Sequence, residues 1–518
     1  MLRDRRVALL RQWVALRAEL GWRSLKRMVR QPEPEYDRAW RKTLGILSRA
    51  PYWTKRGYPR KLEDFPITSF EDYEPGLRDC FERGGSSPFN GAKVRAWVTS
   101  SGTTGARKLF PMTVPGLLQI GPTMGAYDYQ VLSAIPAYLT RPILALIAGA
   151  NPDRSPSGLS ISYGSNLFYR TRPAVWQSLY AIPFALAKIP QGIETWTAAY
   201  ALATDLGVIR SITSRSIVTF LEGIRSNADA ILKRWREERR QIPAHIRPPP
   251  WDRDRWEHAR RVLAKPRWML RELWPHLTGI LTWTSGPCRP DAETVRALAG
   301  PDVRMFDGAN APTEGMISIP MDGPPGAGVV HPQGGILEFL PVTESIDPAR
   351  LLKPWQLEQG KDYEVFMSTW MGFVRYRIKD IVRCIGRFGR MPVVSFQSKA
   401  DRQVRLAIAS LSEQDLIDAS LACKFQLSDR TLFSPSEQFD GLVLWTSEDV
   451  SEQEVEKLDG ALRQVCFTYG KTRARNLIRH IRLTRVPRND PVFKRPFDHG
   501  QAKSRFLLLQ PPDRGAGG

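Results

Sequence analysis

The sequence predicts an α/β fold, with a large N-terminal domain of mixed sheets and helices and a small α/β domain at the C-terminal end. Three observations support this prediction. From residue 61 to about 215, short apolar runs such as 143-ILALIAGA-150 alternate with Gly, Pro and Ser, as in mixed sheets. Strand-like runs return after a mainly helical stretch at 215–275. Beyond about residue 400 the pattern changes to a shorter set of helices and strands.

The expected elements follow in order along the chain. Residues 1–60 form an N-terminal helical segment of the large domain, residues 61–395 form its body, and residues 396–518 form the small domain. A proline-rich, charged excursion interrupts the helical stretch at 241–255. Strands are expected at the apolar runs 94–98, 109–110, 278–286, 335–341, 363–370, 393–397 and 441–446. Helices of the small domain are expected near 412–424 and 451–468.

Composition restricts the class of protein. The 518 residues suffice for two or more domains, and 42% apolar with 25% charged residues argues against wholesale disorder. The net charge of +22 attracts anions of every kind: nucleotides, acidic metabolites, nucleic acid or an anionic membrane. Charge alone does not choose among them, and a basic solvated surface explains it equally well.

The cysteines indicate a reducing compartment. Five cysteines are scattered through the chain, and no two of them have the spacing of metal ligands or of a redox pair. Disulfide scaffolding and a zinc site are therefore not expected. We expect a cytoplasmic protein.

The N-terminal stretch 1–30 is predicted to form an amphipathic helix with a basic face. Val7, Leu10, Val14 and Ala18 recur at steps of three and four residues. The stretch lacks the apolar core and cleavage site of a signal peptide. Two interpretations remain open: docking on the protein's own body, and weak contact with a membrane surface. The most apolar region, 114–150, is too interrupted by Pro and charge to span a bilayer.

The segment 97-WVTSSGTTGARKLF-110 carries the main chemical signal. A loop of Ser, Thr and Gly can point successive backbone N–H groups at one anion, and Arg107 or Lys108 adds positive charge. A flexible linker has a similar composition, but strand-like runs on both sides indicate a tight connection within a domain. The loop differs from the Walker phosphate loop, because Lys108 precedes a strand-like Leu-Phe-Pro instead of entering a helix.

The string 99-TSSGTTGARKLFPMT-113 resembles the phosphate loop of the adenylate-forming ligases. Within them the match is closest to the auxin-responsive acyl-acid amido synthetases, the Gretchen Hagen group of plant proteins and their bacterial relatives. Further strings resemble elements of that family in the correct order: 65-FPITSFEDYEPGLRDCFERG-84, 273-LWPHLTGILTWTSG-286, 312-PTEGMISIP-320, 331-HPQGGILEFLPV-342, 371-MGFVRYRIKDIVRCIG-386 and 499-HGQAKSRF-506. Together they cover roughly residues 65–510.

The resemblance implies ATP- and Mg-dependent chemistry through an acyl-AMP. A large domain would bind ATP and the acid, and a small mobile C-terminal domain would complete the site. The phosphate cradle would consist of Ser100, Ser101, Gly102, Thr103, Thr104 and Gly105, with Lys108 neutralising the β- and γ-phosphates.

Four further residues receive roles from the resemblance. Glu314 matches the magnesium-binding glutamate, and Thr313 would contact the nucleotide phosphate. Asp380 matches the aspartate that accepts both ribose hydroxyls. Lys503 matches the C-terminal lysine that approaches the acyl carboxylate and α-phosphate during adenylation.

Each of these assignments has a simpler alternative. Glu314 can be a turn or capping carboxylate, and Lys503 can be an ordinary surface lysine. Asp380 can be a strand-end aspartate that pairs with a basic neighbour, namely Arg375, Arg377 or Lys379.

The predicted function is that of a ligase that adenylates a hydrophobic carboxylic acid and joins it to an amino acid or amine. Residues 143–166 and 282–286 are expected to contribute walls of the acyl pocket. One alternative is an acyl-CoA ligase, with a thiol acceptor. Another is a catalytically weakened relative that binds membrane or nucleic acid, although the sequence has no helix-turn-helix, zinc-finger or RNA-binding motif, so nucleic acid is not expected. No obligate protein partner is inferred.

The chain departs from the family pattern in four places. Asn310-Ala311 replace Tyr-Gly before the glutamate element, and the loss of a stacking tyrosine would weaken adenine binding. Lys379 replaces the glycine before the ribose aspartate, and Lys399 replaces an arginine near the hinge. Ala409-Ser410 replace an acidic-basic pair, so the departures bear on activity and on the second half-reaction. These positions are Asn310, Ala311, Lys379, Lys399, Ala409 and Ser410.

Overall fold

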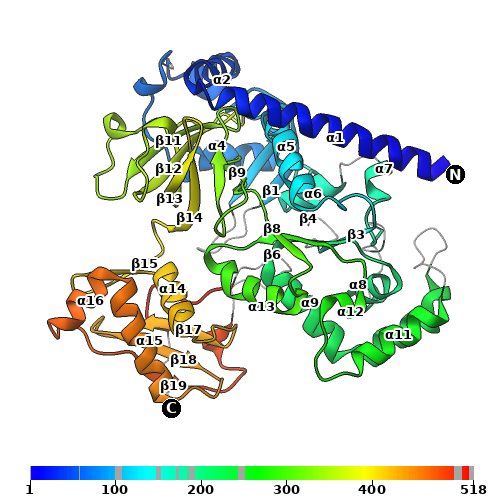
Figure 1. Ribbon diagram of the computed structural model, residues 1–518. Helices are drawn as coiled ribbons and strands as arrows, with labels where there is room; N and C mark the ends of the chain where they lie inside the picture. Colours follow the sequence, from blue (N-terminus) through cyan, green and yellow to red (C-terminus); the bar gives the residue numbers. More distant parts are fainter. Residues whose placement is uncertain are drawn as a thin grey trace.

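The chain folds into a mixed α/β structure, as the sequence predicts (Figure 1). The computed structural model describes residues 2–57, 59–99, 108–146, 153–170, 174–183, 186, 193–242, 251–494 and 504–512. Within these ranges the strands form five sheets. Short 3₁₀ helices lie between them: η1 (Leu62–Asp64), η3 (Glu238–Gln241), η5 (Gly286–Cys288), η6 (Pro348–Arg350), η7 (Pro354–Gln356) and η8 (Pro491–Phe493).

The N-terminal region is helical, as predicted: α1 (Leu2–Met28), α2 (Pro32–Leu47), α3 (Pro51–Thr54) and, beyond the expected segment, α4 (Phe70–Arg83). Helix α1 packs along α5 (Val114–Ala134), and Leu10, Val14 and Ala18 are buried there. The two helices approach closely at Gly21 and Gly125, because a Cβ atom on Gly21 would lie 2.6 Å from the carbonyl carbon of Gly125. The expected docking of the N-terminal helix on the body is confirmed.

A small sheet holds the two strands that flank the Ser/Thr/Gly segment. Its order is β2-β1-β5-β4, and its strands are β1 (Val94–Thr99), β2 (Leu109–Thr113), β4 (Asp153–Arg154) and β5 (Ser160–Ser162). Strand β2 is antiparallel to β1 and lies at the edge of the sheet. An edge strand tolerates Pro111, which has no N–H to donate. The expected strand after Lys108 is confirmed.

A second sheet is parallel and has the strand order β3-β6-β7-β8. Its strands are β3 (Ile143–Leu146), β6 (Val208–Thr213), β7 (Gly279–Trp283) and β8 (Arg304–Asp307). Apolar residues cover both of its faces, since Val208 and Leu281 belong to one hydrophobic cluster while Ile209 and Ile280 belong to another. The helices between β5 and β8 in the chain are α6 (Gly164–Arg170), α7 (Ala174–Gln177), α8 (Ile193–Ala203), α9 (Ser214–Ser226), α10 (Ala228–Arg236), α11 (Arg253–Leu263), α12 (Leu270–Leu273) and α13 (Arg289–Ala299). Of these, α6 contacts β1 of the small sheet and α7 contacts α1.

The largest sheet has the order β11-β12-β13-β14-β10-β9 and is antiparallel. Its strands are β9 (Ser318–Pro320), β10 (Gly328–Val330), β11 (Ile336–Pro341), β12 (Asp362–Ser368), β13 (Tyr376–Phe388) and β14 (Met391–Lys399). The expected strands at 335–341, 363–370 and 393–397 are confirmed as β11, β12 and β14. The 13-residue strand β13 was not expected, because its Arg, Lys and Asp residues hide the apolar alternation.

The described residues between Gln403 and Leu507 build a hydrophobic cluster of their own, and we call them the C-terminal unit. Its elements are β15 (Gln403–Leu406), β16 (Ala409–Ser412), α14 (Glu413–Cys423), β17 (Thr431–Pro435), β18 (Leu442–Thr446), α15 (Glu452–Val465), α16 (Phe467–Ala474) and β19 (Arg482–Arg485). The expected helices and strand correspond to α14, β18 and α15. The unit lies below the large sheet and beside α13 in Figure 1.

Polar contacts join the C-terminal unit to the body. Arg289 of α13 pairs with Asp418 of α14 at 2.9 Å, and Arg215 of α9 pairs with Asp429 at 2.9 Å. Such contacts are individually weak and can be exchanged for water, unlike a packed apolar core. These contacts join α9 and α13 of the body to the C-terminal unit.

Candidate functional site

Lys108 is the first described residue after the Ser/Thr/Gly segment. Ser100, Ser101, Gly102, Thr103, Thr104 and Gly105 lie outside the described residues. The ammonium of Lys108, just before β2, lies 4.9 Å from the ring centroid of Phe70 on α4. Burial lowers the pKa of Lys108, and the carboxylates of Glu314 and Glu71 act in the opposite direction. Lys108 is therefore a half-buried cation in the electrostatic field of two carboxylates.

Glu314 lies in a tight turn between β8 and β9. The backbone N–H of Gly315 donates to the Pro312 carbonyl at 3.1 Å, and the Ile317 N–H donates to the Asn310 carbonyl at 2.8 Å. Gly315 packs closely on Met367, since a Cβ atom would lie 2.7 Å from its sulfur and the methionine side chain would have to move. Thr313 is half-buried in the same turn. The turn fixes Glu314 in the cluster.

Burial raises the pKa of Glu314, although Lys399 and Lys108 oppose the change. Tyr376 of β13 lies near Glu314. Burial raises the pKa of Tyr376, and so does the nearby negative charge of Glu314. The tyrosine therefore stays protonated beside the carboxylate.

Asp380 pairs with Lys399 across β13 and β14. The two residues are cross-strand partners, and the Lys399 Nζ lies 2.5 Å from the Asp380 Oδ1. Asp380 is buried, with a relative exposure of 4%. Burial acts to lower the pKa of Lys399, but the Asp380 carboxylate outweighs it and holds the pKa above its ordinary value. Lys399 therefore stays charged.

The alternative partners proposed for Asp380 are all engaged elsewhere. Arg375 pairs with Glu338 at 2.9 Å and Arg377 pairs with Glu364 at 2.5 Å. Lys379 pairs with Asp401 at 3.1 Å. The alternative interpretation, in which Asp380 pairs with one of these three residues, is therefore wrong, because the partner is Lys399.

The structure brings together Lys108, Glu314 and Asp380, since their side chains are electrostatic neighbours. Sequence reasoning missed Glu71 and Tyr376 and treated Lys399 only as a departure from the family pattern. Glu71 follows Ser69 at the start of α4, and its hydrogen bond to Ser69 lowers its pKa. Glu71 lies in the string 65–84 and Tyr376 in the string 371–386, and both strings resemble the family, which is the signal that could have identified these two residues.

The other departures have local structural explanations. Lys379 adopts φ +64, the left-handed region that the expected glycine favours, inside β13 where the pairing with β12 shifts register. Asn310 pairs with Ser318 in an isolated β-bridge, and Ala311 packs on the main hydrophobic cluster. In the C-terminal unit, Ser410 donates to Gln403 at 2.7 Å within the β15–β16 hairpin that also contains Ala409.

The residues fit magnesium only as part of a nucleotide complex. In the described parts of the chain, three His, Cys, Asp or Glu side chains do not gather in a group able to hold a metal ion. Magnesium is commonly bound by one or two carboxylates together with phosphate oxygens and water. Glu314, buried near Tyr376 and within the electrostatic range of Lys108, is a donor of this kind.

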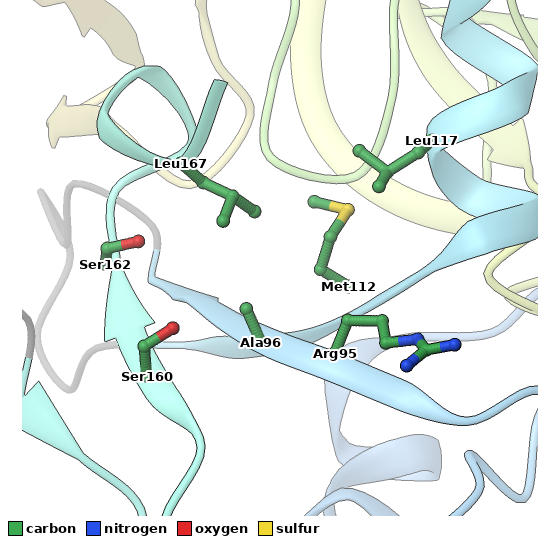
Figure 2. A pocket seen from close by; sticks show the side chains of 7 residues that line it. All are labelled: Arg95, Ala96, Met112, Leu117, Ser160, Ser162 and Leu167. Carbon is green, nitrogen blue, oxygen red and sulfur yellow. The ribbon is translucent and has the colours of Figure 1, made fainter. Parts of the chain in front are cut away.

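A pocket of about 360 Å³ lies beside the strands that flank the loop (Figure 2). Its lining combines apolar side chains, two hydroxyls and one guanidinium: Ala96, Met112, Leu117, Leu167, Ser160, Ser162 and Arg95. Figure 2 shows Met112 and Leu117 on one side and the two serines of β5 on the other. Ser160 and Ser162 belong to the stretch 143–166 that was expected to line an acyl pocket. Residues 282–286 do not line this pocket.

Lys503 lies outside the described residues, but Ser504 next to it is buried and anchored. The Ser504 hydroxyl donates to Asp291 of α13 at 2.6 Å. The backbone N–H groups of Phe506 and Leu507 donate to the Glu413 carboxylate at 2.6 Å and 3.2 Å. The chain just after Lys503 thus joins the C-terminal unit to the body.

The fold is that of the adenylate-forming ligases. The structure is similar to that of 2-hydroxyisobutyryl-CoA ligase in the postadenylation state in complex with R3-HIB-AMP, with a TM-score of 0.52 at 10% identity, covering 92% of this chain and 89% of the other. Residues 62–304 match the GH3 family N-terminal domain, and residues 328–399 match the GH3 family central domain. The chain belongs to the GH3 family of acyl acid amido synthetases.

Individual relatives agree with this assignment. The structure of AtGH3.15 acyl acid amido synthetase in complex with 2,4-DB is similar with a TM-score of 0.80 at 16% identity, covering 95% of this chain and 94% of the other. A putative indole-3-acetic acid-amido synthetase, GH3.10, of Oryza sativa subsp. japonica is 21% identical over 70% of this chain and 77% of its own. A Homo sapiens GH3 domain-containing protein is 28% identical, and that alignment spans 33% of each chain.

Proposed function

We propose that this protein is an ATP- and magnesium-dependent ligase that adenylates a hydrophobic carboxylic acid and conjugates it to an amino acid or amine. The observation that carries the proposal is the cluster of Lys108, Glu314, Asp380 and Lys399 at the end of the Ser/Thr/Gly segment. A cluster of two lysines and two carboxylates suits a nucleotide, which needs cations for its phosphates and an acceptor for its ribose hydroxyls.

In the first half-reaction, a carboxylate oxygen of the acid attacks the α-phosphorus of ATP. The bond from that phosphorus to the bridging oxygen breaks, and pyrophosphate leaves. The loop residues 100–105 and Lys108 would hold the β- and γ-phosphates, and Thr313 would contact the nucleotide phosphate. Magnesium, when bound at Glu314, would supply positive charge for the developing pyrophosphate. Asp380 would accept the ribose hydroxyls.

In the second half-reaction, the acceptor amine attacks the acyl carbon, AMP leaves with the bonding electron pair, and the amine loses a proton. We propose that residues 396–518 act as the mobile small domain and residues 1–395 as the large domain. Lys503 would approach the carboxylate and α-phosphate in the first step and withdraw in the second. The polar contacts of Arg289 and Ser504 with their partners would be exchanged during this movement.

We assign the organic group of the acid to the pocket beside β1. Its apolar lining favours a hydrophobic group, and its two serines and Arg95 offer donors to a polar substituent. The names of the relatives support the substrate class, since they include an indole-3-acetic acid-amido synthetase and a complex with 2,4-DB.

The test is acid-dependent ATP–pyrophosphate exchange with a panel of aryl and fatty acids. We expect exchange with at least one hydrophobic acid, and amide formation when amino acids are added. Thioester as the exclusive product with CoA would replace the amide proposal with the acyl-CoA ligase alternative, and no exchange with any acid would contradict adenylation. Lys503→Ala should lower exchange about a hundredfold, whereas Lys471→Ala on α16 of the same unit should not. Full exchange by Lys503→Ala would remove that residue from its role.

A further inference from the structure

Helix α1 carries a second apolar stripe that faces solvent. Leu9, Trp13, Leu16 and Leu20 are 65%, 53%, 60% and 57% exposed. Their spacing of four, three and four residues places them on one face of the helix, over a length of about 17 Å. Isolated exposed apolar residues are ordinary, but four in a row on one helix mark an interaction surface. This stripe is separate from Leu10, Val14 and Ala18, which pack on the body.

The helix that carries this stripe is rich in cations. Between residues 7 and 30 the sequence has six cations, Arg11, Arg17, Arg23, Lys26, Arg27 and Arg30, and a single carboxylate, Glu19. Arg11 lies on the opposite face, the Arg17 guanidinium lies 5.2 Å from the Trp13 ring centroid and pairs with Asp128 of α5, and Arg23 pairs with Glu19 at 2.6 Å. Lys26, Arg27 and Arg30 are exposed, and Arg27 continues the stripe one heptad beyond Leu20. The surface is therefore apolar along the stripe and basic at its C-terminal end.

The position of α1 leaves this face accessible. In Figure 1 the helix runs along the outer edge of the molecule, away from the C-terminal unit. No helix among the described residues is long and apolar enough to cross a membrane. The exposed stripe suits a helix that lies flat on a surface.

We propose that the Leu9–Leu20 stripe of α1 inserts into the interface of an anionic lipid bilayer. Tryptophan is favoured at the boundary between headgroups and acyl chains, where its ring is apolar and its N–H is hydrated. The basic residues at the end of the stripe would meet anionic headgroups. A second copy of this helix is a poorer partner, because pairing two such faces brings cations together with one glutamate on each side.

The experiment measures binding of the full-length protein to sedimenting vesicles of phosphatidylglycerol with phosphatidylcholine, and to vesicles of phosphatidylcholine alone. We expect binding to the anionic vesicles that falls about tenfold or more on pure phosphatidylcholine and weakens with salt. Trp13→Gln with Leu16→Gln should lower binding to the anionic vesicles about tenfold or more, since Gln keeps the helix but removes the apolar groups. Lys26→Gln with Arg27→Gln should reduce the dependence on anionic lipid and on salt.

The matched control is Phe467→Gln with Leu477→Gln, which removes two apolar side chains of 68% and 48% exposure from the C-terminal unit. This variant should bind vesicles like the wild type, and all variants should unfold at the same temperature. Absence of wild-type binding, or equal binding by the Trp13/Leu16 variant, would overturn the proposal. Light scattering tests the other occupant. If the wild type is a dimer, the Trp13/Leu16 variant is a monomer and vesicle binding is unaffected, the stripe is an interface between copies of this chain. Failure of adenylation assays has no bearing on this result.

Discussion

The Lys399 ammonium lies 2.5 Å from one carboxylate oxygen of Asp380, and the two residues face each other across neighbouring strands. A lysine is a point charge that can satisfy one oxygen, whereas an arginine can bind both oxygens in a fork. Lys399 therefore places positive charge beside Asp380, although Oδ1 accepts no hydrogen bond of normal geometry in the described structure. In the proposed function, the carboxylate would accept the ribose hydroxyls.

Asp380→Asn tests this relationship. The amide has one acceptor oxygen and no charge, so we expect the KM for ATP in pyrophosphate exchange to rise about tenfold or more. The KM for the acid should change much less. Asp362→Asn removes a carboxylate from the neighbouring strand β12, where Asp362 pairs with Arg383 at 2.7 Å, and should leave both constants unchanged. An unaltered KM for ATP in the Asp380 variant would contradict the ribose assignment.

At position 379 we expect a Gly variant to be more stable than an Ala variant, which is the reverse of the usual order. Its φ of +64 strains any residue with a Cβ atom, and this strain exceeds the extra entropy that Gly gains on unfolding. We expect Lys379→Gly to be more stable than Lys379→Ala by about 0.5–1 kcal/mol, measured by urea unfolding. Both variants lose the ion pair with Asp401, so their difference isolates the backbone.

Lys457 in the middle of α15 is the matched control for this comparison, because it is exposed and helical. There Gly should be less stable than Ala by about 1 kcal/mol. If Ala is the more stable residue at both positions, the left-handed conformation at Lys379 does not carry the expected strain.

Local patterns in the sequence predicted many elements, because strands and helices differ in the spacing of apolar residues. The apolar runs that became β7, β11 and α15 are of this kind. Strand β13 was missed because its exposed and half-buried positions carry Arg377, Lys379 and Arg383. The partners of the two arginines lie on β12, and the partner of Lys379 is Asp401 in the turn after β14. Pairing between distant segments is not visible in a local pattern.

The same limit applies to the site. Motif order indicated Lys108, Glu314 and Asp380, but not the residues that position them. Tyr376 and Glu314 lie 62 positions apart in the chain and meet only through packing of β13 against the turn after β8. On α1, periodicity found the face that packs on α5. It did not identify Leu9, Trp13, Leu16 and Leu20 as exposed. The helix has two apolar stripes, and only the structure shows which of them is buried against the body.

Leu117→Trp tests the pocket assigned to the acid. The larger indole would fill part of a pocket of about 360 Å³, so we expect the KM for the best acid to rise about tenfold while the KM for ATP stays within about twofold. Leu118→Trp is the control, since Leu118 is adjacent on α5, is 62% exposed and does not line the pocket. Equal effects of the two substitutions, or an unchanged KM for the acid, would contradict this assignment.

His331 predicts a loss of stability in mild acid. It is buried with 1% exposure, its Nδ1 accepts from the Gln333 backbone N–H at 3.0 Å, and burial lowers its pKa to about 3. The unfolded chain takes up a proton as the pH falls below about 6.5, while the folded protein does not, so stability falls between pH 6.5 and pH 3. His331→Asn keeps an acceptor and cannot titrate.

Relative to this variant, the wild type should lose about 3 kcal/mol of unfolding free energy between pH 7 and pH 4, measured by urea unfolding at each pH. The control is His480→Asn at an exposed position, whose unfolding free energy should change with pH as that of the wild type does. If the unfolding free energy of the wild type instead changes with pH as that of His331→Asn does, the buried imidazole takes up a proton and the prediction is wrong.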